Sequence, residues 1–345
     1  MNNQNNKETR GKLYRLTIGA GKVLIAGAVA FFILNLFAHF YYNIPGRAVS
    51  YQNSTDFART ENDPYFKMVE GFGYGKTDAK GFNNVRVIEN PDILIIGSSQ
   101  LEGYNVKTEE NITAILNDMF SKDGSNLEAY NIGVSGHNFG VCLNNLGEAY
   151  EEFNPKKYVV IETRDVLLEP EQMDKLQNGT YPRDDAIPRG VAAFLQKSDY
   201  LRLVYLKLSE MRVQKAKPTV AAPVPAEEWD EEYISTLNAI LSNAKEEVGD
   251  CRLIIISSGS IMLDGENVQE RANEHKYEIL KKVCLENDIV FLDTYEDFKK
   301  LYEEKKVLPS GFSNTHLGKG HLNAHGHQVL AEKLYGAITE MEGAR

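Results

Sequence analysis

Five short aliphatic runs recur along the chain after residue 90, and stretches with a helical pattern separate them. The runs occupy residues 93–96, 129–132, 158–163, 252–257 and 289–293. Strands that are aliphatic throughout are typical of parallel sheets that helices cover on both faces. The pattern therefore predicts an α/β fold with three layers, α/β/α, around a five-stranded parallel sheet of the doubly wound, flavodoxin-like type.

The segments between the runs predict helices over 108–122, 138–152 and 324–340. Thr108 and Asn323 are expected at the starts of the first and last of these helices, because their side-chain oxygens accept bonds from free backbone N–H groups. In doubly wound sheets a ligand binds beyond the carboxyl ends of the strands. The residues that follow the first three strands are therefore expected to line one crevice.

An apolar segment from Val23 to Phe40 contains only Asn35 and His39 as polar residues. With two tyrosines after it the segment reaches about 20 residues, the length that crosses a bilayer core of roughly 30 Å. Before it, five Lys and Arg stand against one Glu, and such a flank stays in the cytoplasm. We expect a single-pass cell-membrane protein with a cytoplasmic tail over 1–21, a transmembrane signal anchor over 22–42 and an extracytoplasmic remainder.

A cleaved signal peptide is the alternative interpretation of this segment. Its apolar region is normally shorter and ends in a small-residue cleavage site, whereas here the run ends in aromatic residues.

The net charge of −11, after a basic tail, means that the rest of the chain is strongly acidic. Nucleic acid is therefore excluded as a partner, because binding phosphates needs clustered Lys and Arg. The three cysteines lie far apart and predict buried apolar side chains rather than a disulfide framework: Cys142, Cys251 and Cys284.

The remaining organisation follows from composition. Residues 43–90 are polar and rich in Gly, which predicts an extended extracytoplasmic stem before a globular domain over 91–345. An insertion at about 166–228 has a helical stretch near 190–214 and then a Pro/Ala segment, which is expected to be extended. We interpret the insertion as an elaboration over the crevice.

Three short motifs in this domain carry residues suited to chemistry. A turn with Gly97, Ser98 and Ser99 follows the first strand, and a Gly-rich turn over 131–137 follows the second. His321 precedes the last helix. A serine hydroxyl becomes a good nucleophile when a base lies within about 3 Å, and a histidine from another loop supplies one.

Together these motifs resemble those of the SGNH/GDSL hydrolase superfamily. Its first block, G-D-S-x-x-x-G, is similar to residues 97–103, with Ser98 in place of the aspartate, which implies Ser99 as the nucleophile. The second block resembles Asn131 to Gly136 and implies the Gly136 N–H as an oxyanion donor beside that of Ser99. The fifth block, D-x-x-H before a helix, is similar to residues 318–321 and implies His321 as the base. The resemblance further implies that the neighbours of these residues bind substrate: Ser98, Gln100, Asn131 and His137.

Two positions depart from the family pattern. The third block usually offers an Asn after the third strand, where this chain has Arg164, a longer donor that an oxyanion still accepts. Position 318 is Gly, so the acid that orients His321 is missing from its usual place. Either a backbone carbonyl supports a Ser-His dyad, or a carboxylate comes from elsewhere, with Asp165 and Glu162 as candidates.

Four of the seven histidines lie within twelve residues: His316, His321, His325 and His327. A zinc site is one interpretation. However, His325 and His327 fall on different faces of the first turn of the last helix, which favours packing or capping. We therefore expect no metal and no other cofactor.

An SGNH-like domain held outside the membrane by one helix resembles proteins that add or remove acyl groups on cell-surface glycans, often beside a multi-pass membrane acyltransferase. The expected function is that of a serine esterase or O-acyltransferase acting on acyl groups, acetyl above all, of such a glycan. Two alternatives stay open. One is a catalytically inactive glycan-binding or assembly protein on the same fold, and the other is a metal-dependent hydrolase that uses the histidine cluster.

Overall fold

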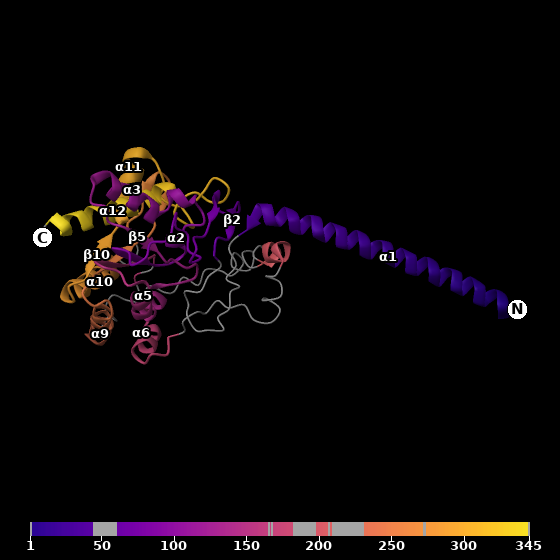
Figure 1. Cartoon of the computed structure of the whole chain (residues 1–345), viewed down its shortest axis with the longest axis horizontal. Helices are drawn as coiled ribbons and strands as arrows, with labels where there is room; N and C mark the ends of the chain where they lie inside the picture. The colour runs from indigo at the N-terminus through magenta and orange to yellow at the C-terminus, as the bar shows by residue number, and fades with distance from the viewer. Residues whose placement is uncertain are drawn as a thin grey trace. The chain divides into compact units, whose positions relative to one another are not determined.

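The computed structural model describes residues 2–43, 61–164, 166, 168–181, 198–205, 208, 231–271 and 274–343. The chain divides into two units, one formed by residues 1–43 and 188–219 and the other by residues 44–187 and 220–345. Figure 1 shows the long helix α1 of the first unit and the α/β body of the second.

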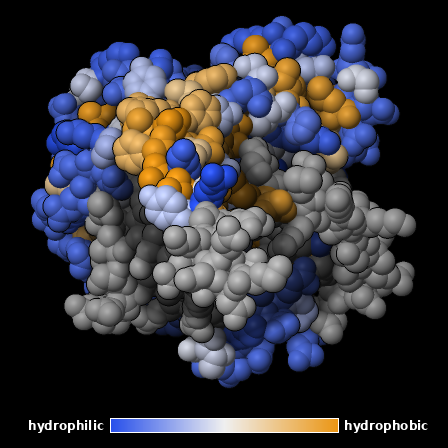
Figure 2. All heavy atoms as spheres, turned by 90° about the vertical axis from the view of Figure 1, so that its right-hand side faces the viewer, coloured by the Kyte–Doolittle hydropathy of each residue, from blue (hydrophilic) through white to orange (hydrophobic). Residues whose placement is uncertain are grey.

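The first unit contains α1 (Asn2–Tyr41), a single helix that runs through the expected basic tail and the apolar segment. Its portion Tyr14–Tyr41 is long and apolar enough to cross a membrane. Figure 2 views the molecule from the N-terminal side of this helix and shows hydrophobic side chains in orange. The span expected over 22–42 therefore lies on a helix that begins well before residue 22.

Both polar side chains of the apolar segment have partners in the insertion. The Ser198 hydroxyl donates to Asn35 Oδ1 at 2.6 Å, and His39 Nδ1 lies 3.0 Å from Asp199 Oδ2. The Tyr200 ring packs edge-on against Phe31, with ring centroids 6.1 Å apart. The described part of the insertion helix thus belongs to the same unit as α1, a contact that the sequence did not predict. Its expected place over the crevice stays a prediction.

The second unit is built on a five-stranded parallel sheet in the order β10-β7-β6-β4-β5, which confirms the predicted fold class. Each strand begins within one residue of its predicted start, and every residue of β4 and β6 is buried. The strands are β4 (Ile93–Ile96), β5 (Ala129–Asn131), β6 (Tyr158–Thr163), β7 (Arg252–Ser257) and β10 (Val290–Asp293).

Helices cover both faces of this sheet because alternate strand residues point to opposite sides. Leu94 and Val159 pack on one face and Ile93 and Val160 on the other, each within its own apolar cluster. The first cluster includes residues of α4 (Phe139–Asn144), α5 (Leu146–Phe153), α6 (Pro170–Gln177), α9 (Glu231–Glu247) and α10 (Glu274–Glu286). The second includes residues of α3 (Ile112–Asp123), α11 (Tyr295–Lys305) and α12 (Ala324–Gly343). The three cysteines are free and buried, as expected.

One helix start differs from the expectation, one predicted helix is divided in two, and one helix start agrees. Thr108 begins a short 3₁₀ turn, η2 (Thr108–Glu110), and α3 begins at Ile112 with Asn111 as its cap. The predicted helix over 138–152 is divided at Asn145 into α4 and α5. Asn323 caps α12 as predicted, because its Oδ1 accepts the N–H of His325 at 3.0 Å.

Residues 61–90 form a folded part of the second unit, so the prediction of an extended stem is wrong over this range. The strands β2 (Pro64–Lys67) and β3 (Gly73–Lys76) pair as an antiparallel hairpin. Tyr65 is fully buried, and the Cβ of any residue at position 73 would lie 2.1 Å from the Tyr104 carbonyl oxygen. The glycines that suggested an extended stem are thus needed for close packing. The first residues of the predicted stem, 44–60, lie outside the described residues.

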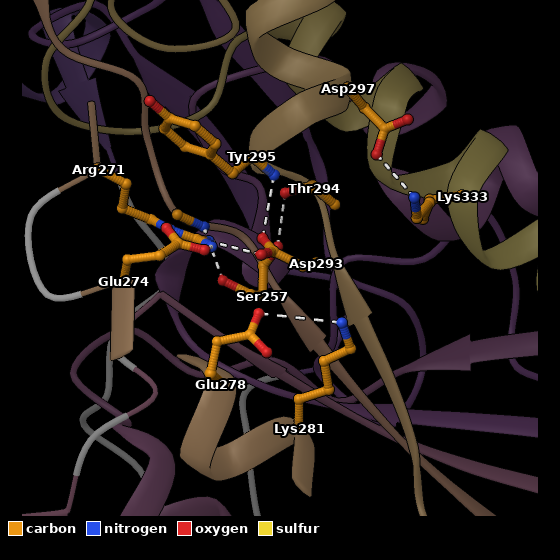
Figure 3. A network of polar contacts seen from close by, with 11 residues as sticks. Ser257, Arg271, Glu274, Glu278, Lys281, Asp293, Thr294, Tyr295, Asp297 and Lys333 are labelled. Carbon is orange, nitrogen blue, oxygen red and sulfur yellow. Dashed lines mark hydrogen bonds and ion pairs between the residues drawn. The ribbon is translucent and has the colours of Figure 1, made fainter. Parts of the chain in front are cut away.

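A polar network stabilises the carboxyl ends of β7 and β10 (Figure 3). The Arg271 guanidinium donates to Asp293 at 2.6 Å and stacks on the Tyr277 ring, 3.6 Å from its centroid. The Thr294 hydroxyl donates to the Ser257 carbonyl at 2.6 Å. These contacts hold the segment after β7, which carries the small hairpin of β8 (Leu263–Asp264) and β9 (Asn267–Val268).

Candidate active site

The turn after β4 presents Ser99 at the carboxyl edge of the sheet. Ser99 is the first residue of the short helix α2 (Ser99–Glu102), and Ser98 caps that helix by accepting the Gln100 N–H at 3.1 Å. The Ser99 Oγ lies 2.9 Å from His321 Nε2, although the two residues are 222 positions apart. The structure therefore brings together the two side chains that the sequence motifs paired.

The acid that orients His321 is Glu70. His321 Nδ1 lies 2.8 Å from Glu70 Oε2, and the His321 backbone N–H donates to the other carboxylate oxygen at 2.8 Å. Of the two residues that the sequence suggested, Glu162 does not take this place. Glu162 instead accepts bonds from Ser98 and Ser258, and Asp165 lies outside the described residues.

Glu70 was missed because it belongs to the loop between β2 and β3, in the segment interpreted as a stem. The sequence does hold a weak signal, since Glu70 is the only acidic residue between Pro64 and Thr77. The structure also shows a close fit at the histidine loop, where Gly320 has a φ of +87° and its Cβ would be 2.1 Å from Glu70 Oε1. Position 320 thus leaves room for the carboxylate only when it is glycine.

The electrostatics of the pair assign the proton positions. Burial opposes ionisation of Glu70, but hydrogen bonds and charge from His321 outweigh it and lower its pKa to about 2. An ionised carboxylate only accepts hydrogen bonds, so His321 Nδ1 carries a proton and Nε2 is left to accept from Ser99. The side chains of His321 and Glu70 are 25% and 23% exposed, which leaves the site open to solvent.

Two asparagines hold the loop that carries Glu70. Asn105 Nδ2 donates to the Glu70 carbonyl at 2.7 Å, and its Oδ1 accepts from Lys67 Nζ at 2.9 Å. Asn314 donates to the carbonyls of Met68 and Gly71 at 2.9 and 2.8 Å. The acid is thus fixed from both sides, by residues before α3 and by residues before α12.

Three residues expected to bind substrate have side chains that are engaged within the protein. Gln100 is buried, and its Oε1 accepts the Leu322 N–H at 2.7 Å, which ties α2 to the histidine loop. Asn131 is buried and donates to the Leu101 carbonyl at 2.8 Å. Ser98 serves as the helix cap and donates to Glu162. These contacts position the turns of the site, and the substrate contacts expected of Gln100, Asn131 and Ser98 stay a prediction.

The loop after β5 approaches the nucleophile turn, as expected for an oxyanion loop. The Val134 N–H donates to the Gly97 carbonyl at 3.0 Å, and the Ser135 N–H and hydroxyl both bond the buried Glu102. Gly136 is exposed with a φ of +92°, a conformation that favours glycine. His137 is buried beside it. Arg164 is exposed at the end of β6. The oxyanion roles of Gly136 and Arg164 and the substrate contact of His137 stay predictions.

The other histidines do not join the site as ligands. His316 and His325 are exposed, and His327 is fully buried in α12. Burial, together with the charge of His321, lowers the pKa of His327 to about 3. Among the described residues, no three His, Cys, Asp or Glu side chains are grouped so that they could hold a metal ion.

Comparisons with known proteins find similarity at the level of structure. No protein-family model matches the sequence, and no curated protein matches it either. One similar structure is an α/β hydrolase enzyme from the metagenome of Lake Arreo, Spain, at 15% identity, with a TM-score of 0.41 and coverage of 73% of this chain and 97% of that one.

Two further similar structures are esterases. A two-domain esterase active on acetylated mannans has 9% identity and a TM-score of 0.41, with coverage of 73% of this chain and 50% of that one. A catalytic mutant of an acetylxylan esterase from Geobacillus stearothermophilus has 15% identity and a TM-score of 0.38, with coverage of 73% and 95%. The likeness is distant, and the chemistry proposed below rests on the geometry of the site.

Proposed function

We propose that this chain is a membrane-anchored serine esterase or O-acyltransferase that acts outside the cytoplasm on acyl groups of a cell-surface glycan. One observation supports the chemistry above all: the unbroken series of contacts from Glu70 through His321 to Ser99, at 2.8 and 2.9 Å. Nucleophile, base and orienting acid within hydrogen-bond reach of one another are the arrangement that activates a serine hydroxyl.

The reaction begins when the Ser99 Oγ attacks the acyl carbonyl carbon and passes its proton to His321 Nε2. Glu70 stabilises the imidazolium that forms. The backbone N–H groups of Ser99 and Gly136, with Arg164, bind the developing oxyanion. His321 then protonates the departing alkoxide, which leaves the acyl group on Ser99. Water or a sugar hydroxyl attacks this ester, giving its proton to His321, and the proton returns to Ser99 as the product leaves.

The inactive binding protein is the weaker candidate. It was suggested by Gly318 and Arg164, the two departures from the family pattern, and Glu70 now provides a carboxylate at the required atom of His321. The glycan substrate and the extracytoplasmic location draw on the family resemblance and on the apolar helix α1. A multi-pass acyltransferase is the partner that we expect to deliver or receive the acyl group.

Labelling with a fluorophosphonate probe tests the nucleophile. We expect the full chain in detergent to be labelled at Ser99 and to hydrolyse p-nitrophenyl acetate, and we expect Ser99→Ala to lose both. Ser313→Ala, which changes an exposed serine, is the matched control and keeps both. A wild-type chain that neither reacts with the probe nor turns over the ester contradicts the proposal, as does labelling that persists in Ser99→Ala.

A second measurement separates transfer from hydrolysis. The chain is given p-nitrophenyl acetate with and without an oligosaccharide that offers free hydroxyls, and acetylated sugar is measured by mass spectrometry. Acetylated sugar that depends on Ser99 identifies an acyltransferase. Release of acetate alone identifies an esterase.

A further inference from the structure

Glu162 is a buried carboxylate that the mechanism above does not use. It lies near the end of β6, beside β4, and is 1% exposed. Its Oε2 accepts the Ser98 backbone N–H at 2.8 Å and the Ser98 hydroxyl at 2.9 Å, and its Oε1 bonds the Ser258 hydroxyl. Burial raises its pKa, which its hydrogen-bond donors offset only in part.

Two of the three hydrogen bonds of Glu162 come from the turn that presents the nucleophile, and the third comes from Ser258, directly after β7. Ser98 precedes Ser99 and caps α2, and Glu162 bonds both its main chain and its side chain. The fit is close, because a Cβ at position 97 would lie 2.6 Å from Glu162 Oε2. A buried carboxylate is costly unless several hydrogen bonds compensate for its lost hydration. Two of the bonds that compensate for the burial of Glu162 therefore come from the turn before Ser99, and they fix the position of that turn relative to β6.

We propose that Glu162 is a positioning residue, which holds the Ser98–Ser99 turn so that the Ser99 hydroxyl meets His321. The carboxylate that the G-D-S pattern would supply from position 98 reaches this turn from the neighbouring strand instead. The inference rests on the proposed function, since it concerns the same nucleophile. Glu162 does not touch the reacting atoms, and its effect passes through Ser98.

Three variants separate positioning from folding. Glu162→Ala removes all three bonds. Glu162→Gln keeps an oxygen for Ser98 and offers an N–H to the Ser258 hydroxyl, so it preserves the geometry without a charge. Ser98→Ala removes the hydroxyl bond and the helix cap, and leaves the backbone bond in place. Glu247→Ala, in a half-buried glutamate of α9, is the matched control.

The experiment measures hydrolysis of p-nitrophenyl acetate by the full chain in detergent, with thermal melting as a check of folding. A displacement of about 1 Å at a nucleophile costs about a hundredfold in rate. We expect Glu162→Ala to lower kcat by about that factor with KM unchanged, and Glu162→Gln to stay within about tenfold of the wild type. Ser98→Ala should fall between them, and Glu247→Ala should match the wild type. Where Glu162→Ala does not fold, the kcat values of the other two variants decide. A lower kcat in Ser98→Ala than in Glu162→Gln then supports the inference, and equal values overturn it.

Hydrogen exchange of the peptide over residues 97–101 tests the inference independently of esterase activity. The Ser98 amide should lose protection in Glu162→Ala and keep it in Glu162→Gln. Unchanged kcat and unchanged protection in Glu162→Ala overturn the inference. A loss of kcat in Glu162→Gln as large as that in Glu162→Ala also overturns the inference, because the charge of Glu162 and not its geometry would then be responsible. A wild-type chain without esterase activity refutes the proposed function, whereas the exchange result still decides the role of Glu162.

Discussion

At the scale of single residues, the site depends on carboxylates that take different roles in different environments. Glu70 is ionised beside His321 and is partly exposed. Glu162 is fully buried, bonds serines and has a raised pKa. Glu102 is buried and holds the loop after β5 through Ser135. Only Glu70 reaches the histidine, because it alone of the three comes from the β2–β3 loop, and the other two fix the turns around the nucleophile.

Glu70→Gln is expected to lower kcat by about 10³- to 10⁴-fold with little change in KM, by analogy with the loss of the orienting acid in a Ser-His-Asp triad. The Gln amide can present an N–H to His321 Nδ1, which would place the imidazole proton on Nε2 and prevent it from accepting from Ser99. Steady-state hydrolysis of p-nitrophenyl acetate measures the effect. Glu340→Gln, at an exposed site on α12, is the control. Full activity in Glu70→Gln would remove the acid from the mechanism.

His327 predicts how stability depends on pH. Its pKa is about 3 in the folded chain, against 6.5 as the ordinary value. Between these two values the unfolded chain binds a proton that the folded chain does not, so the free energy of unfolding falls as pH falls from 6.5 toward 3. The slope reaches about 1.4 kcal/mol per pH unit. Above pH 6.5 the contribution is fully present.

The comparison of two neighbouring histidines tests this. Urea unfolding at pH 7 and pH 4.5 should show a smaller loss of stability in His327→Gln than in the wild type. His325→Gln, on the same helix turn but exposed, should lose as much as the wild type. An equal loss in all three chains would assign the acid sensitivity to other groups.

At the scale of elements, the site joins four turns that the central sheet and one hairpin hold. The turns after β4 and β5 and the loop before α12 lie where the parallel topology predicts them. The β2–β3 hairpin does not follow from that topology. Asn105 and Asn314 hold its loop in place, because their side chains bond backbone atoms of residues 68–71.

Asn314→Ala should lower kcat about tenfold, because the loop loses three hydrogen bonds and Glu70 moves relative to His321. The free energy of unfolding should change much less than after a core substitution, since Asn314 is exposed. Activity and urea unfolding are measured on the same preparations. Asn243→Ala on α9, an exposed contact outside the site, is the control. A large loss of stability without a specific loss of kcat would contradict the positioning of Glu70 by Asn314.

At the scale of the whole molecule, one chain combines an apolar helix, a basic N-terminal flank and an acidic remainder. The helix α1 exposes several phenylalanines: Phe31, Phe32, Phe37 and Phe40. A lipid bilayer is the environment that suits such an apolar surface. The polar pair Asn35 and His39 is matched by Ser198 and Asp199. The described residues of the insertion therefore belong to the same unit as α1.

The full chain is expected to remain in the membrane fraction after an alkaline carbonate wash. Protease added to the outer side of intact cells should degrade the α/β domain and leave an N-terminal tag intact, because the basic flank keeps the first residues in the cytoplasm. Immunoblotting against tags at both ends measures this. Release of the chain by carbonate, or loss of the N-terminal tag to external protease, would contradict the proposed topology.

The sequence by itself determined the parallel sheet and the apolar helix, and the resemblance of its motifs to those of the SGNH/GDSL hydrolases implied the pairing of Ser99 with His321. Aliphatic runs and Gly-rich turns are local patterns, and the topology of a parallel sheet brings its turns to one edge. Only the tertiary structure decided which carboxylate orients the histidine and which residues hold the turns. Glu70 lies 251 positions from His321, and Gln100, Asn131 and Glu162 bond groups that are distant along the chain. Such contacts depend on how separate elements pack, and no local pattern encodes them.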